Sequence, residues 1–148
     1  MPKVDVRSTR QMTASREALW AVLGDLNRLP EWLAFANEVS DVSGDAATAP
    51  GGTYTVKPKK SYEPETKWEV TEVEPGERQL HVSEMPMIAG VRSEIELRQA
   101  PGGGLEAHAH WSGDPKGFVG KLMRPMFQKR IQQNWDASLE QLDRVAGA

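Results

Sequence analysis

The stretch that decides the fold is the C-terminal segment Lys116–Ala148, which reads KGFVGKLMRPMFQKRIQQNWDASLEQLDRVAGA. Its apolar residues recur with the period of an α-helix, so most of the segment is predicted to be one long helix. One face of that helix carries Phe127, Ile131, Asn134, Trp135, Ser138 and Leu142. Pro125 either starts this helix in its first turn or kinks a longer one. A mostly apolar face with an amide and a hydroxyl in its middle favours a helix that helps to enclose a small-molecule cavity.

The segments before this helix alternate in the manner of half-buried strands. Residues 3–12 form the first predicted strand, and two short helices follow, one capped by Ser15 and one around residues 28–35. Further strands are predicted at 39–42, 54–57, 67–70, 80–83, 91–98 and 105–111. In each strand apolar residues alternate with polar ones, which indicates an antiparallel meander with one face in solvent.

The composition indicates a single domain spanning residues 1–148, and the five Trp among them suggest a core with large aromatic walls. Cysteine is absent, which excludes a disulfide framework, a thiolate zinc site and a cysteine nucleophile. The formal charge of −3, with both signs mixed, gives no footprint for nucleic acid. No apolar run reaches the length of a membrane span and no signal peptide precedes Val4, so we expect a cytoplasmic protein without stable membrane insertion.

Three parts of the chain resemble the polyketide cyclase/dehydrase and lipid-transport family. The opening signature of that family is similar to Ala18-Leu19-Trp20, Asp25 and Pro30-Glu31-Trp32. Its central strand and turn resemble Trp68–Pro75, and its closing helix resembles Ser138–Leu142. The resemblance covers nearly the whole chain and places it in the START-like superfamily, also called SRPBCC or Bet v 1-like.

The resemblance implies an α+β helix-grip fold. In this fold a bent antiparallel sheet of about seven strands surrounds a long C-terminal helix, and two short helices follow the first strand. The superfamily includes carriers, cyclases, hydroxylase domains and stress proteins. The resemblance therefore specifies the fold more closely than the function.

The candidate ligand-binding residues are those that this arrangement turns toward the space between sheet and helix. They are Trp32, Trp68, Met87, Ser93, Trp111, Phe127, Ile131, Asn134, Trp135 and Ser138. Aromatic walls would bury the rings of a ligand, and the amide of Asn134 and the hydroxyl of Ser138 would orient its polar group. The alternative is structural: buried polar groups also pair with each other, with the backbone or with water, and a serine can bond to its own helix.

A metal site is not expected. Glu106, His108 and His110 share one face of the strand 105–111, but residues four apart on a strand lie about 13 Å from each other, too far to hold one ion. The opposite face of this strand is apolar and consists of Leu105, Ala107, Ala109 and Trp111. The histidines are therefore expected in solvent, and we expect neither a metal nor another cofactor.

Catalysis by general acids and bases needs a titratable side chain at the cavity wall. The apolar faces offer Glu84 and Asp114, both near strand ends, and Arg124 one turn before the main helix face. In the strand 80–83 (LHVS) the leucine and the valine alternate with the polar residues, so His81 is not expected to face inward. No nucleophile-elbow motif occurs. No catalytic residue is therefore assigned.

Three apolar segments, Met85–Ile88, Trp32–Phe35 and Gly117–Gly120, have three possible roles. They gather at the mouth of the cavity, they pack on each other as a satellite core, or they dock a partner, which includes a second copy in a homodimer.

Three functions are compatible with these patterns. The leading hypothesis is that the protein binds or carries a small hydrophobic, aromatic or lipid-like ligand in an internal cavity. The first alternative is a polyketide aromatase/cyclase or dehydratase that acts in the same cavity. The second is a macromolecular interaction module of the quinone-handling or toxin type, which requires a continuous surface patch.

Overall fold

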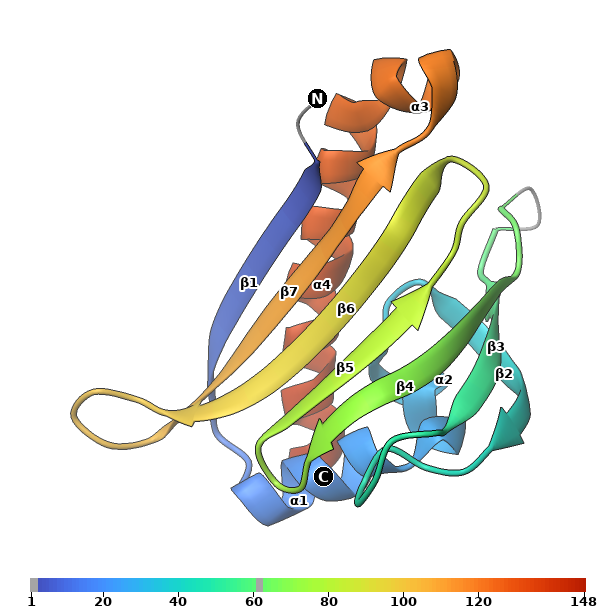
Figure 1. Ribbon diagram of the computed structural model, residues 1–148. Helices are drawn as coiled ribbons and strands as arrows, with labels where there is room; N and C mark the ends of the chain where they lie inside the picture. Colours follow the sequence, from blue (N-terminus) through green and yellow to red (C-terminus); the bar gives the residue numbers. More distant parts are fainter. Residues whose placement is uncertain (1–2, 61–62) are drawn as a thin grey trace.

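The computed structural model describes residues 3–60 and 63–148. The first two residues of the predicted domain 1–148 therefore lie outside the described residues. The elements follow each other in an order close to the predicted one (Figure 1). They are β1 (Val4–Met12), α1 (Arg16–Gly24), the 3-10 turn η1 (Leu26–Arg28), α2 (Leu29–Trp32), β2 (Ala36–Ser43), β3 (Thr53–Pro58), β4 (Thr66–Glu74), β5 (Arg78–Ser83), β6 (Ile88–Gln99), β7 (Leu105–Pro115), α3 (Gly117–Leu122) and α4 (Arg124–Gly147).

The seven strands form one antiparallel sheet with the order β1-β7-β6-β5-β4-β3-β2. Figure 1 shows α4 running along one face of the bent sheet, with α1 and α2 at the end where the C-terminus lies. Helix α4 packs against β1 and β7 and against both short helices. The predicted helix-grip architecture is therefore confirmed.

Helix α4 presents the predicted face to the sheet. Trp135, Ser138 and Leu142 are buried, and Phe127, Ile131 and Asn134 toward its N-terminal end are half-buried. The segment is divided into two helices at Met123, and Pro125 lies in the first turn of α4, where its missing N–H leaves no bond unmade. Of the two roles considered for Pro125, the helix start is the one observed.

Strand β7 has the predicted orientation. Ala107, Ala109 and Trp111 are buried in the core, whereas His108 and His110 are only half-buried. His108 Nε2 lies 3.1 Å from Glu106 Oε1 and His110 Nε2 lies 2.9 Å from Asp5 Oδ1. The two histidines thus have separate carboxylate neighbours on the outer face of the sheet.

Strand β5 corrects the expectation for His81. Residues directly opposite each other on antiparallel strands share a face, and β5 pairs Ser83 with Trp68 and His81 with Val70, both of which belong to the core. His81 therefore points inward and is 8% exposed. Leu80 lies on the outer face, where the register places it opposite Glu94. Alternation shows that a strand has two faces, but it identifies the inner one only if the apolar residues are the ones that lie inside.

Candidate functional site

A cavity of about 450 Å³ lies between the sheet and the N-terminal half of α4. The helix contributes Phe127, Ile131 and Asn134 to its wall, and the sheet contributes Trp111 among others. The loop between β5 and β6 adds Met85, Pro86 and Met87, which we call the Met loop. The wall is predominantly apolar. The volume of the cavity is typical of a pocket for a small organic molecule.

Few polar groups reach this cavity. Arg130 pairs with Glu63 across its edge, which leaves both charges compensated. Asn134 is different, because its side-chain amide has no hydrogen-bond partner anywhere in residues 3–60 and 63–148. A half-buried amide at an apolar wall is suited to bind the polar group of a ligand.

A second, much smaller void of about 20 Å³ lies farther inside, and Phe35 lines both spaces. Trp32 and Trp135 line this void, and their rings are tilted against each other with centroids 6.2 Å apart. Both indole Nε1 atoms are buried and find no acceptor among the described residues. The void has the size of one oxygen-centred group. The two Nε1 atoms belong to residues that line it, but both atoms are themselves covered by protein.

A buried chain of hydrogen bonds ends at the same inner void. Gln79 Nε2 donates to the carbonyl oxygens of Leu23 and Ala46, at 2.9 Å and 3.0 Å. Gln79 Oε1 is therefore free to accept from His81 Nε2 at 3.0 Å. His81 Nδ1 then accepts from the Tyr54 hydroxyl at 2.7 Å. This assignment makes His81 neutral and leaves the Tyr54 oxygen with lone pairs to offer.

Burial sets the protonation states along this chain. It lowers the pKa of His81 to about 4, because a charged imidazolium loses its hydration in the core. Burial also raises the pKa of the Tyr54 phenol far above its usual range. Both groups are therefore neutral at physiological pH, and His81 serves as an acceptor that orients the Tyr54 hydroxyl.

The ten sequence-predicted residues divide into three groups. The main cavity is lined by Met87, Trp111, Phe127, Ile131 and Asn134. The inner void is lined by Trp32, Trp68, Ser93 and Trp135. Ser138 reaches neither space, because its hydroxyl accepts from the Ala34 N–H at 2.8 Å and donates to the Asn134 carbonyl at 2.6 Å. Ser138 thus holds the segment after α2 against α4.

Several lining residues were not among those predicted. Phe35 and Arg130 line the main cavity, and Tyr54 and His81 line the inner void. Tyr54 had a usable signal, since it lies two residues from the inward Val56 and therefore on the same face of the strand. His81 had none, because a polar side chain that alternates with apolar residues is typical of a solvent face.

Neither carboxylate considered for catalysis faces the cavity. Glu84 is exposed, accepts from the Gly90 N–H at 2.9 Å and lies 3.8 Å from Lys116 Nζ. Asp114 is exposed near the end of β7. Within residues 3–60 and 63–148 no group of three or more His, Asp or Glu side chains is arranged to hold a metal ion.

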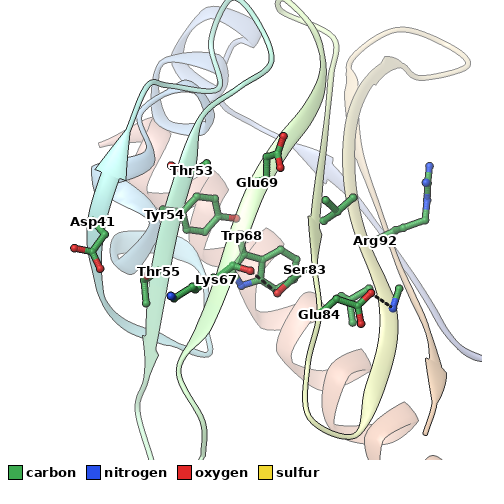
Figure 2. A pocket seen from close by; sticks show the side chains of 13 residues that line it. Asp41, Thr53, Tyr54, Thr55, Lys67, Trp68, Glu69, Ser83, Glu84 and Arg92 are labelled. Atoms are coloured by element: carbon green, nitrogen blue, oxygen red, sulfur yellow. Dashed lines mark hydrogen bonds between the residues drawn. The ribbon is translucent and has the colours of Figure 1, made fainter.

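The opposite side of the sheet carries a larger but shallower hollow of about 770 Å³ over β3 to β6 (Figure 2). Side chains of both charges border it, among them Lys67, Glu69 and Arg92. Tyr54 and Trp68 also border it, although both residues belong to the core on the other face. We favour the cavity beneath α4 as the ligand site, because it is more enclosed and its wall is mostly apolar.

A bent antiparallel sheet that grips a long C-terminal helix, with a cavity between the two, is the arrangement of a START-like protein. The chain belongs to the polyketide cyclase/dehydrase and lipid transport family, whose model matches residues 3–147. None of the curated proteins compared with the chain matches it in sequence.

Solved structures share the fold at low sequence identity. The di-domain ARO/CYC StfQ from the steffimycin biosynthetic pathway superimposes with a TM-score of 0.79 and 11% identity over 98% of this chain, which spans about half (51%) of StfQ. Proteins of Mesorhizobium loti and Chromobacterium violaceum superimpose with TM-scores of 0.73 and 0.69 at 17% and 18% identity. Each of these two alignments covers 97% of this chain. They cover 96% of the Mesorhizobium loti protein and 98% of the Chromobacterium violaceum protein.

No helix in the part of the chain that the structure describes is both long enough and apolar enough to cross a membrane.

Proposed function

We propose that the protein binds or carries a small hydrophobic, aromatic or lipid-like molecule in the cavity beneath α4. The observation that carries the proposal is a cavity of about 450 Å³ with a mostly apolar wall and one unpaired amide, that of Asn134. Burial of an apolar ligand in such a space is favourable, and the amide supplies direction without the cost of a buried charge.

The inner void supports a ligand that has a polar end. Tyr54 lines it and adds a hydroxyl oxygen whose own proton is donated to His81, and Trp32 and Trp135 beside it have buried indole N–H groups without an acceptor among the described residues. A ligand hydroxyl that passed Phe35 would find the Tyr54 oxygen as an acceptor. The proposed occupant therefore has an apolar, ring-bearing body and at least one hydroxyl or carbonyl oxygen.

The experiment is native mass spectrometry of the protein as purified, followed by calorimetric titration of the ligand-free protein with 2-naphthol. The proposal predicts a co-purifying small molecule or saturable binding of one 2-naphthol per chain. A matched variant, Ile131→Trp, extends a ring from α4 into the cavity and is expected to abolish binding while it keeps the unfolding temperature. Absence of any ligand and of any binding heat would contradict the proposal, as would equal binding by the variant.

A polyketide aromatase/cyclase or dehydratase is the second candidate. Trp32 and Trp135 beside the inner void favour it, because their buried indole N–H groups have no acceptor among the described residues and fixed donors in a dry site stabilise an oxygen that gains negative charge. Trp135→Phe removes one donor and keeps an aromatic side chain. Reconstitution with a polyketide synthase that supplies an uncyclised chain tests this candidate: a product that requires the wild type and is lost in Trp135→Phe supports it, and an unchanged product spectrum contradicts it.

A further inference from the structure

The large hydrophobic side chains that are exposed in the described structure all lie within nine residues of sequence. Phe118 is 81% exposed, Val119 56%, Leu122 66% and Met126 39%. We call these four residues the α3 patch. Scattered exposed apolar residues are ordinary, but a cluster confined to one short helix and the following turn marks an interaction surface.

The charge around the α3 patch has one sign. Between Pro115 and Asp136 every charged residue is basic, although the chain as a whole carries −3. Lys116 is close to Glu84 and Arg130 pairs with Glu63. The remaining basic side chains in this segment have no ion pair within residues 3–60 and 63–148, and they are Lys121, Arg124 and Lys129.

The α3 patch is joined to the entrance side of the cavity. The Lys116 N–H donates to the Met87 carbonyl at 2.8 Å, and a Cβ on Gly120 would lie 2.8 Å from the same oxygen. Met87 itself lines the cavity. Figure 1 shows α3 at the far end of β7, beside the N-terminal end of α4. Helix α3, which carries most of the α3 patch, therefore lies directly beside the Met loop.

We propose that the α3 patch docks on the surface of a lipid bilayer that contains anionic lipids, with the Met loop turned toward the membrane. Apolar side chains entering the interface beside unpaired lysines and arginines are the combination that such surfaces bind. A second copy of the chain is a poorer partner, because a symmetric contact would bring the same three cations face to face. Docking would let an apolar ligand pass between bilayer and cavity without crossing water.

The test is co-sedimentation of the full chain with vesicles of phosphatidylcholine, prepared with and without phosphatidylglycerol. The proposal predicts binding to the anionic vesicles only, with an affinity that falls as salt is added. Phe118→Ser combined with Leu122→Ser is expected to weaken binding about tenfold or more, while the unfolding temperature stays unchanged because both side chains are exposed.

Charge is tested by a matched pair of double variants. Lys121→Gln with Lys129→Gln should weaken vesicle binding about tenfold or more. Lys67→Gln with Arg92→Gln removes the same net charge from the outer hollow of Figure 2 and should leave binding nearly unchanged. No binding to anionic vesicles at low salt, or an equal loss in both pairs, overturns the proposal. It is also overturned if sedimentation of the protein alone shows a dimer that Phe118→Ser dissociates. None of these results depends on whether the cavity binds 2-naphthol.

Discussion

His81 shows how burial and hydrogen bonding together set the state of one side chain. In the unfolded chain an imidazole binds a proton near pH 6.5, whereas burial lowers the pKa of His81 in the fold to about 4. Between these values the unfolded state binds more protons than the folded state, so stability decreases as the pH falls through this window. Above pH 6.5 the group adds no pH dependence.

The first prediction follows from this difference. The free energy of unfolding should decrease by up to about 1.4 kcal/mol per pH unit on account of His81 as the pH falls from 6.5 toward 4. In His81→Gln this contribution should disappear, and the variant should show a shallower decline. Urea denaturation at a series of pH values measures both slopes, and equal slopes would mean that His81 is not buried in its neutral form.

Asp143 presents the opposite case, a buried carboxylate that stays ionised. Burial by itself would raise its pKa, but the Ala14 and Thr13 backbone amides and the Thr13 hydroxyl donate to it at 2.9 to 3.0 Å and lower the pKa. These bonds fasten the turn between β1 and α1 to helix α4. Their stabilisation is present above the ordinary carboxyl pKa and is lost as the pH falls through the lowered folded value.

The second prediction is that Asp143→Asn costs about 1.5–3 kcal/mol, because an amide group replaces a charged acceptor of several hydrogen bonds. Glu140→Gln, one turn away on the exposed side of α4, is the control and should cost under about 0.5 kcal/mol, since it breaks only a surface pair with Arg144. Chemical denaturation at neutral pH measures both. If Asp143→Asn is as mild as the control, the carboxylate does not anchor the turn.

Asn134 and Ser138 lie one turn apart, yet the structure gives them different roles. The third prediction is that Asn134→Leu weakens binding of 2-naphthol by about 1–3 kcal/mol, the cost of an unpaired ligand hydroxyl, and leaves stability unchanged or slightly higher. Ser138→Ala should instead reduce stability, because the half-buried Ala34 N–H loses its acceptor. Naphthalene, which has no hydroxyl, should bind wild type and Asn134→Leu alike. Calorimetry measures the binding of both ligands. If Asn134→Leu weakens the binding of 2-naphthol and of naphthalene equally, the Asn134 amide does not bind the ligand hydroxyl.

Helix α4 combines two environments along its length. Its C-terminal half is packed against the sheet and the short helices, and Leu139 is completely buried there. Its N-terminal half borders the cavity, where Ile131 is only half-buried. Gln128 and Gln132 in the N-terminal half bond to the β1 backbone at Asp5 and Arg7, so both halves are held to the sheet. Only the cavity-facing side of the N-terminal half borders open space, which allows a ligand to bind without loosening the core.

The fourth prediction compares the two halves of α4. Leu139→Ala should cost about 2–5 kcal/mol, because it leaves a hole in a close-packed core. Ile131→Ala should cost about 1 kcal/mol, since its side chain already borders a cavity and few packing contacts are lost. Thermal or chemical unfolding measures the difference. Equal losses would indicate that the N-terminal half of α4 is packed like the rest.

At the level of elements, the strands were predictable because apolar and polar residues alternate along them. Helix α4 was predictable because its apolar residues recur with the helical period. The inner face of β5 was not, because Gln79, His81 and Ser83 bury their polar side chains through contacts with distant parts of the chain, such as the Leu23 carbonyl. The boundary between α3 and α4 was left as one of two alternatives, because a proline can start a helix or kink a longer one, and the structure has Pro125 in the first turn of α4.

At the scale of the whole molecule, the fold brings together residues that are far apart in the sequence. Trp111 and Asn134 could be placed on the cavity wall from periodicity and from the family resemblance. Phe35 belongs to the segment Trp32–Phe35, for which the cavity mouth was one of three possible roles. Arg130 could not be placed, since its long charged side chain pairs with Glu63 only after folding. The split into a main cavity and an inner void depends on the ring positions of Trp32 and Trp135, which no sequence pattern specifies.

The measurement that tests the central claim most directly is a titration of ¹⁵N-labelled protein with 2-naphthol, followed through the five Trp indole N–H resonances. Trp111 lines the main cavity, and Trp32 and Trp135 line the inner void. Trp20 donates to the Ala47 carbonyl at 2.9 Å, lines neither space and is the internal control. Ligand binding beneath α4 predicts saturable shifts of Trp111, Trp135 and Trp32 while Trp20 stays in place. If no indole resonance moves, or if Trp20 moves as far as the others, the cavity is not the binding site.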